Sequence, residues 1–219
     1  MYCGQSAKTK EHIPPRCLFP QPRPNDLLTL PACEKCNNEN SKDDEYFRDS
    51  LLCDHRLEVN PSCKQLLENF QRSLGRPQAK GRLIAMQENL RQFPLFTPTG
   101  LYRGKGRALG FEFDRMCRVL ERIMKGLFLH EFKKPIPDNW STEFESTKTM
   151  DQSPEIMQAF LRLVQNTPKM RTWGADIFSY GFQKFEEDAN ATFWVFSFYG
   201  TVMFFGFTHP YGPQNGVSV

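Results

Sequence analysis

The chain has 219 residues, of which 39% are hydrophobic and 13% aromatic, a composition that supports a packed core and excludes a wholly disordered chain. The sequence has no apolar run of about eighteen residues, so it predicts no membrane span, and the N-terminus lacks a secretory signal. The net charge of +3 is unevenly divided, because residues 61–139 carry +8, residues 1–60 carry −2 and residues 140–219 carry −3. This basic middle segment suggests a polyanion partner, although a solvated basic surface explains the charge equally well.

Residues 1–39 contain six prolines, which remove backbone donors and restrict the preceding residues, so no long helix can form there. We expect a compact irregular knuckle with short strands that is too small to be stable without a staple. The chain has seven cysteines and no visible export signal, which favours reduced thiols and metal ligation over disulfides. The sequence therefore predicts a cytoplasmic protein with a metal-stapled N-terminal segment.

A polar helix is predicted over residues 40–53, with Ser41 as its N-cap and acidic residues in its first turn. A second helix is predicted over residues 62–74, where apolar residues recur at helical spacing. Gly75-Arg76-Pro77 would end this helix. Residues 82–92 could form a third.

A turn is predicted at residues 97–100, followed by two short strands at 101–103 and 108–110 around a flexible glycine-containing loop. The strongest helical pattern then covers residues 113–132, where apolar residues keep an i, i+3, i+4, i+7 rhythm. Four cations form a stripe on another face of this helix, namely Arg115, Arg118, Arg122 and Lys125.

The C-terminal part is predicted to be mainly β. A helix capped by Ser153 is expected over residues 153–166. The strands are expected at residues 141–149, 177–185, 191–199 and 201–208. Near-continuous aromatics in the last two strands favour a buried antiparallel meander covered by helices. A base-stacking platform is the alternative interpretation.

Three cysteines of the first 39 residues could bind one zinc ion. Cys33 and Cys36 form a Cys-x-x-Cys pair, whose thiolates can share a tetrahedral zinc, and Cys3 could supply a third sulfur. The fourth ligand could be Cys17, His12 or the terminal amine. Buried cysteines without metal are the alternative, and a redox pair is less favoured because no βαβ pattern surrounds it.

The sequence Glu11-His12-Ile13-Pro14-Pro15 places a histidine directly after a carboxylate, with prolines that fix the backbone direction. Together with Cys33-x-x-Cys36-Asn37, it resembles the HNH (His-Me finger, ββα-metal) nucleases in their zinc-stapled form. The resemblance covers roughly residues 1–48, and the order of motifs is also similar to a group of small bacterial HNH-endonuclease-like proteins. Their C-terminal portion is similar to residues 60–210, with no known function of its own.

The resemblance implies that His12 is the general base that activates water for attack on a phosphodiester. Glu11 and Asn37 would hold one divalent ion, Mg²⁺ or Mn²⁺, which leaves coordination positions open for phosphate oxygens. Cys3, Cys33 and Cys36 would hold a structural Zn²⁺. A role as effector of a bacterial defence or mobile-element system, gated by a regulatory or targeting partner protein, also follows from the resemblance.

Two positions depart from the family pattern. The orienting asparagine has no match at its usual spacing, where Leu28 stands, and Asn25 in a slightly longer loop is the substitute. Ser41 occupies a position that is often a histidine metal ligand. Asp44 and Glu45 could help to bind the ion, and ordinary helix N-terminal charges are an equally good interpretation of both.

The predicted fold is α+β: an N-terminal zinc-stapled ββα-metal (treble-clef-like) finger, a helical segment, and a C-terminal antiparallel sheet packed with helices. We place the boundary near residue 58, which gives an HNH-like nuclease module at 1–58 and an α+β domain at 59–219 that binds substrate or a partner. Candidate nucleic-acid contacts in this second part are cations of the predicted loop and helix: Arg103, Lys105, Arg107, Arg115, Arg118, Arg122 and Lys125. A solvated basic face is the alternative.

Two hypotheses for function follow. The first is a metal-dependent HNH endonuclease that hydrolyses phosphodiester bonds in nucleic acid, most of all DNA. The second is a non-catalytic zinc-knuckle module that binds nucleic acid or protein.

Overall fold

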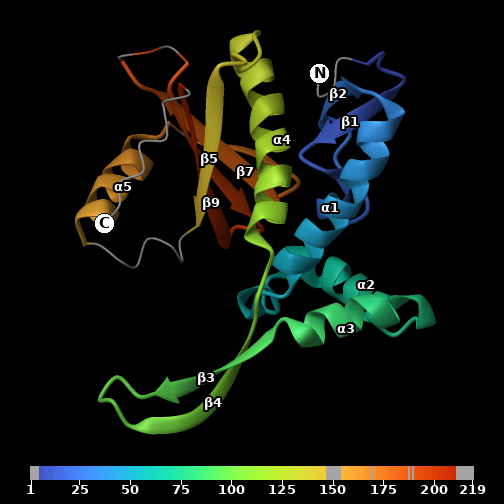
Figure 1. Ribbon diagram of the computed structural model, residues 1–219, viewed down its shortest axis with the longest axis vertical. Coiled ribbons are helices and arrows are strands. Elements are labelled where there is room, and N and C mark those ends of the chain that lie inside the picture. The colour runs from blue at the N-terminus through green and yellow to red at the C-terminus, as the bar shows by residue number, and fades with distance from the viewer. Residues whose placement is uncertain (1–4, 147–153, 169, 187, 189, 211–219) are drawn as a thin grey trace.

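The structure is a computed structural model, and it describes residues 5–146, 154–168, 170–186, 188 and 190–210. Its largest unit is a five-stranded antiparallel sheet in the order β5-β9-β8-β7-β6. The strands are β5 (Trp140–Ser146), β6 (Arg171–Trp173), β7 (Phe178–Lys184), β8 (Thr192–Phe198) and β9 (Val202–Pro210). Helix α4 (Phe113–Phe132) lies on one face of the sheet and helix α5 (Pro154–Asn166) on the other (Figure 1). The prediction of an α+β fold with a helix-packed antiparallel sheet is confirmed.

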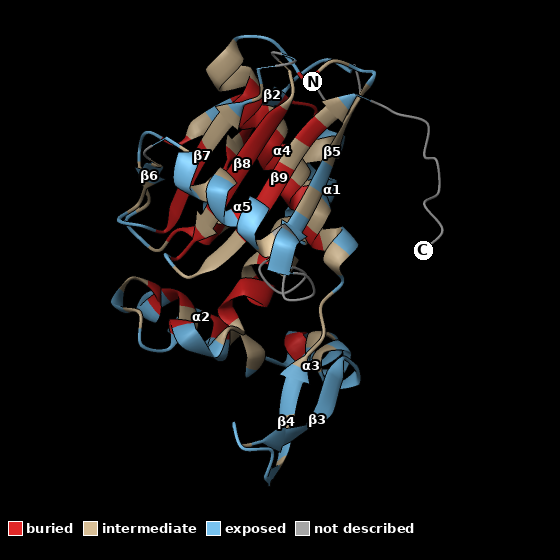
Figure 2. Cartoon of the chain, turned by 90° about the vertical axis from the view of Figure 1, so that its left-hand side faces the viewer, coloured by how far each residue is buried: buried red, intermediate tan, exposed pale blue. Residues whose placement is uncertain are grey.

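Alternate residues of β8 fill the two sides of the sheet. Trp194, Phe196 and Phe198 belong to the large core shared with α4, whereas Phe193 belongs to a smaller cluster around Phe160 of α5. All four of these β8 rings have a relative exposure of 0%, and Figure 2 shows the central strands buried. The aromatic run is therefore core, because successive side chains of a strand point to opposite faces and both faces are covered.

The N-terminal segment forms a hairpin followed by a helix: β1 (Thr9–Ile13), β2 (Leu28–Ala32) and α1 (Glu34–Leu52). The hairpin packs on α4 at Gly126, where an added Cβ would lie 2.8 Å from Ile13 Cγ1 and 2.9 Å from Leu30 Cδ1. Only a glycine at this position allows so close an approach, since any side chain would occupy the space of the hairpin.

Residues from both sides of the predicted boundary near residue 58 share one hydrophobic cluster. Ile13, Phe47 and Phe198 are all members of this cluster. The rings of Phe47 on α1 and Phe198 on β8 lie edge to face, with centroids 5.1 Å apart. The N-terminal segment is thus buried against the rest of the chain.

A second hairpin projects from the body (Figure 1). It follows helices α2 (Lys64–Leu74) and α3 (Lys80–Glu88), and it consists of β3 (Leu90–Phe96) and β4 (Tyr102–Leu109). The predicted helix over residues 82–92 is therefore wrong beyond Glu88. The predicted flexible loop between two short strands is also wrong, because Gly104, Lys105 and Gly106 belong to the single strand β4.

The other predicted helices are confirmed where the structure describes them, and α4 has the predicted bounds. Ser153, the predicted cap of α5, lies outside the described residues. The start of α1 differs from the prediction. The helix begins at Glu34, with Cys33 as its N-cap, so Ser41 lies inside the helix and its hydroxyl donates to the carbonyl of Asn38. The C-terminal strands agree with the prediction to within two residues where the structure describes them, and residues 147–149 lie outside the described part. Strand β6 was not predicted.

None of the described helices is long and apolar enough to span a bilayer.

Candidate functional site

Glu11 and His12 lie next to each other on β1 and face opposite ways, because side chains alternate along a strand. Glu11 is 4% exposed and faces α1 and α4, whereas His12 is half-buried on the other face. Their partners on β2 are Leu30 and Thr29 respectively. The carboxylate and the imidazole therefore have separate surroundings.

The Glu11 carboxylate belongs to a buried polar cluster between β1, α1 and α4. Its Oε1 accepts a hydrogen bond from Arg122 Nη1 at 2.6 Å and another from Asn40 Nδ2 at 3.3 Å. The other end of the Arg122 guanidinium donates from Nη2 to Asp44 Oδ1 at 2.5 Å. Burial raises the pKa of Asp44 to about 6, although Arg122 opposes this effect. One arginine thus bridges two carboxylates from different elements.

His12 is surrounded by different charges. Burial and the positive charges of Arg16 and Arg23 lower the pKa of His12 below its usual 6.5, so the imidazole is neutral at pH 7. The Nε of Arg23 is buried without a hydrogen-bond partner among the described residues. Arg23 also lines a pocket of about 200 Å³ together with polar side chains, including Arg48, Gln65 and Asn69. This side of the hairpin is therefore basic.

Asn37, Asn25 and Glu45, three further predicted site residues, form no hydrogen bond with Glu11 in the part of the chain that the structure describes. Asn37 lies in the first turn of α1, where its N–H donates to the carbonyl of Cys33 at 3.0 Å. Asn40, one turn further on, is the residue that contacts Glu11. Asn25 lies in an exposed turn before β2, and Glu45 is exposed on α1. The i, i+3 spacing from Asn37 could have indicated Asn40, because both lie on one face of the helix.

The expected zinc ligands are placed only in part. Cys33 Sγ accepts the N–H of Cys36 at 3.4 Å, so the pair lies at the N-terminus of α1, whereas Cys3 lies outside the described residues. Burial raises the pKa of Cys17, a candidate fourth ligand, to about 12, and its thiol donates to the carbonyl of Asp44. Within the part of the chain that the structure describes, no group of three His, Cys, Asp or Glu side chains could hold a metal ion.

The predicted basic stripe on α4 is paired with acidic residues. Arg115 and Arg118 both bind Asp43 of α1, at 2.5 and 2.9 Å. Arg122 binds Glu11 and Asp44, as described above, and Lys125 pairs with Glu121 one turn earlier on the same helix at 2.5 Å. Most of the stripe therefore contributes to the packing of α4 on α1.

Arg103, Lys105 and Arg107 lie on β4 in the projecting hairpin. All three are exposed, and none of them forms an ion pair with a described residue. Of the predicted nucleic-acid contacts, these three keep their charge available to a ligand.

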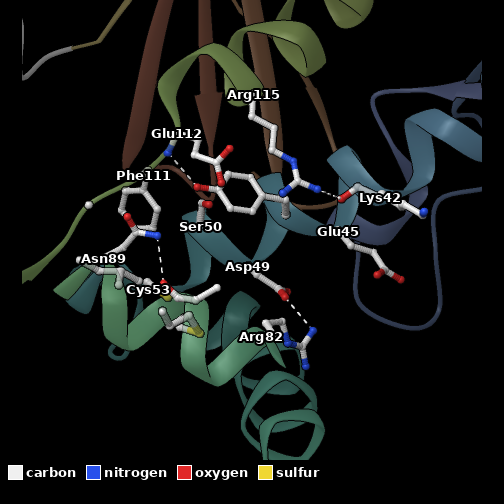
Figure 3. Close-up of a pocket in the computed structure, with 15 residues that line it drawn as sticks. Lys42, Glu45, Asp49, Ser50, Cys53, Arg82, Asn89, Phe111, Glu112 and Arg115 are labelled. Carbon is white, nitrogen blue, oxygen red and sulfur yellow. Dashed lines mark hydrogen bonds and ion pairs between the residues drawn. The ribbon is translucent and has the colours of Figure 1, made fainter. Parts of the chain in front are cut away.

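A further pocket of about 360 Å³ lies where this hairpin joins the body (Figure 3). The hydroxyl of Tyr46 accepts the backbone N–H of Glu112 at 2.8 Å, and the guanidinium of Arg115 lies 4.2 Å from the centre of the Tyr46 ring. On the opposite side, Arg82 of α3 donates to Asp49 of α1 at 2.9 Å. No motif in the sequence indicates this pocket, since its lining comes from α1, α3 and the segment before α4.

Comparison of the chain with protein-family models, with curated proteins and with solved structures found no match. What the protein does is therefore inferred from the residues described above.

Proposed function

We propose that the protein is a metal-dependent endonuclease of the HNH type that hydrolyses phosphodiester bonds in nucleic acid, most of all DNA. As in the bacterial proteins it resembles, it would act as the effector of a defence or mobile-element system. The observation that carries the proposal is that His12, on the N-terminal hairpin, is neutral and lies beside two arginines. The residue before it, Glu11, faces the helix α1 that follows the hairpin.

His12 would be the general base. A base must be unprotonated at the working pH to take a proton from water, and the lowered pKa of His12 meets this requirement. The attacking water would give a proton to the imidazole while its oxygen forms the new bond to phosphorus. The bond from phosphorus to the ester oxygen would break, and the departing oxygen would take a proton from solvent.

The substrate phosphate would bind beside Arg16 and Arg23. Both guanidinium groups are close enough to disfavour protonation of His12, and guanidinium matches the geometry of phosphate oxygens. The buried Nε of Arg23 has no acceptor among the described residues, so a phosphate oxygen would satisfy it.

The divalent ion would bind Glu11 and Asn37, which offer the oxygen donors that hard cations prefer. Arg122 occupies Oε1 of Glu11, whereas the hydrogen bond that Oε2 accepts from Asn40 Nδ2 is long, at 3.5 Å, so a cation would compete for Oε2 more easily than for Oε1. To stabilise the charge that develops on a phosphate beside His12, the ion would need the Glu11 carboxylate to leave Arg122 and turn towards the His12 face. Cys33 and Cys36, with Cys3, would hold the structural zinc.

Cleavage of plasmid DNA with Mg²⁺ or Mn²⁺ tests the proposal. We expect His12→Ala to reduce the cleavage rate by about 100-fold or more, which is typical of a lost general base. His55→Ala is the matched control, because the His55 side chain is 88% exposed and lies outside the hairpin and α1. Equal cleavage by wild type and His12→Ala, or no cleavage with either metal, contradicts the proposal.

A non-catalytic zinc-knuckle module that binds nucleic acid or protein is the second candidate. It is favoured by the 2.6 Å contact of Arg122 with Glu11, which already neutralises the carboxylate expected to bind the ion. Salt-sensitive DNA binding that survives both His12→Ala and Asn37→Ala, without any cleavage, would select this candidate.

A further inference from the structure

The hairpin formed by β3 and β4, residues 90–109, is called the arm below. Its longer strand has eight residues and therefore extends about 25 Å. None of residues 90–109 is buried, and Figure 2 shows both strands exposed below the body. A two-stranded ribbon with no core is stabilised only by its own pairing, and such ribbons are marginal in water. The exposed surface of the arm is therefore available to a ligand.

The register of the arm separates two faces. On one face, Phe93 lies opposite Gly106 and Leu95 opposite Gly104. A Cβ on Gly106 would lie 2.7 Å from Cζ of Phe93, so the ring rests on the glycine and is held flat against the ribbon. On the other face, Lys105 lies opposite Pro94 and Arg107 opposite Gln92. Two cations therefore lie together on one face, and the ring of Phe93 and the aliphatic side chain of Leu95 lie on the other, with Arg91 at its base.

The charge of the arm has a single sign. Residues 90–109 contain four cations and no Asp or Glu, and the cations are Arg91, Arg103, Lys105 and Arg107. Lys105 and Arg107 share a face two residues apart, which places their backbones about 7 Å apart. Like charges on one strand repel each other, and no carboxylate stands across from them, so a bound polyanion would remove the repulsion.

The tip of the arm carries large apolar side chains. Phe96 and Tyr102 face each other across the last pair of the ladder, with ring centroids 5.9 Å apart. They are 58% and 59% exposed, and Leu101 beside them is 68% exposed. Exposed aromatic rings next to cations can stack on nucleobases, since every base has a π-face.

We propose that the arm is a nucleic-acid-binding element, in which Lys105 and Arg107 contact the phosphate backbone and Phe96 and Tyr102 contact bases. A two-stranded ribbon has the right width for the major groove of a DNA duplex. A single-sign basic face with no acidic residue matches a phosphate backbone better than it matches a protein surface of mixed charge. The proposal shares the ligand class of the proposed nuclease, but it does not depend on cleavage by His12.

Fluorescence anisotropy of a labelled 20-base-pair duplex, with and without a single-stranded overhang, tests the arm. The deletion variant replaces residues 92–107 by Asn-Gly, which joins Arg91 to its partner Ala108 with a tight hairpin turn. Because none of the deleted residues is buried, the body is expected to keep its fold, which circular dichroism and the unfolding midpoint would verify. Lys105→Gln/Arg107→Gln removes only the basic face.

We expect the deletion to weaken binding at least tenfold. Lys105→Gln/Arg107→Gln should reduce the slope of log K against log salt concentration by about 2, because each phosphate contact contributes about one unit. Phe96→Ser/Tyr102→Ser should weaken binding to the overhang more than binding to the blunt duplex. Lys134→Gln/Arg162→Gln removes two cations outside the arm and should leave the slope unchanged.

Equal affinity of the deletion variant and its His12→Ala parent overturns the proposal, as does an equal loss in the Lys134→Gln/Arg162→Gln control. Arm-dependent binding to anionic lipid vesicles in place of DNA would identify a membrane surface as the ligand and would also overturn it. All measurements use the His12→Ala background without a divalent ion, so DNA binding through the arm can be found even where cleavage is absent.

Discussion

Arg122 of α4 donates a hydrogen bond to Glu11 of β1 over 2.6 Å, although 111 positions separate the two residues in the chain. The Arg122 side chain is 10% exposed and that of Glu11 is 4% exposed, so the pair is removed from water. A charge that is removed from water destabilises the folded state unless an opposite charge lies beside it. Arg122 also donates a hydrogen bond to Asp44, so its guanidinium is paired with two carboxylates. The pair fixes the N-terminal hairpin to the helix that covers the sheet.

Arg122→Met should destabilise the protein by about 3–5 kcal/mol, because it leaves the buried Glu11 and the half-buried Asp44 without their cation. The free energy of unfolding from urea titration measures this loss. Arg118→Gln is the matched control on the same helix, since Arg118 is 57% exposed in its pair with Asp43 and should contribute less than about 1 kcal/mol.

A double variant separates the pair from the surrounding packing. Glu11→Gln/Arg122→Met should be less destabilised than the sum of the two single variants, because the second substitution removes a charge that the first leaves unpaired. Simple additivity of the two losses would show that Glu11 and Arg122 do not interact energetically.

Two glycine substitutions should change stability in opposite directions. Gly126→Ala should cost about 1–3 kcal/mol, because its Cβ would lie 2.8 Å from Ile13 Cγ1 in the packed core. A Cβ added at Gly81 in α3 would have no other atom within 4 Å. Gly81→Ala should therefore raise the free energy of unfolding by about 0.5–1 kcal/mol, since alanine favours the helix. Thermal unfolding of both variants measures the difference, and a stabilised Gly126→Ala would contradict the close approach of α4 to the hairpin.

The imidazole of His12 should titrate below pH 6.5, because burial, Arg16 and Arg23 all disfavour its protonated form. Its contribution to stability is then present above pH 6.5 and is lost as the pH falls through the lowered pKa. NMR titration of the ring protons measures this pKa directly.

Replacing the two neighbouring arginines tests the cause of the shift. Arg16→Gln/Arg23→Gln should raise the pKa of His12 but leave it below 6.5, because burial is the largest cause and remains. An unchanged pKa in this variant would contradict the assignment of a basic surface beside His12.

Protein purified without chelator should contain about one zinc ion per chain if Cys33 and Cys36 bind metal as proposed. Cys36→Ser should release most of the zinc, as measured by elemental analysis. Cys117→Ser on α4 is the control and should leave the zinc content unchanged. A zinc content well below one ion per chain in the wild type would contradict the proposed structural zinc site at Cys33 and Cys36.

The helix α4 could be predicted to the residue because its apolar side chains repeat at the helical period and Pro135 follows it. The start of α1 could not be predicted in this way. Its first turns contain Cys36, Asn37 and Asn38, which are weak helix formers, and the capping acceptor is a cysteine sulfur rather than a serine hydroxyl. Strand β3 was missed because its pairing with β4 depends on contacts between distant residues, such as Phe93 on Gly106.

The candidate site was predicted from local motifs, and local motifs do not show which charges neutralise each other. Glu11 and His12 are adjacent in sequence, yet the strand turns one towards Arg122 and the other towards Arg16 and Arg23. The predicted stripe on α4 had the right residues on one side of a helix. Those arginines face acidic residues of α1 because of tertiary packing. The spacing of residues within one helix does not predict such packing.

The residues before the arm and the residues after it share one hydrophobic core, although the chain that connects them runs through the exposed arm. A protease that cuts at the tip, within the exposed residues 98–100, would therefore break the backbone without disturbing a buried contact. The two fragments, residues 1–98 and 99–219, would stay together through contacts such as Phe47 on Phe198. The protein could thus be produced as two separate polypeptides that assemble, and the tip is a natural position for attaching a label or a second protein.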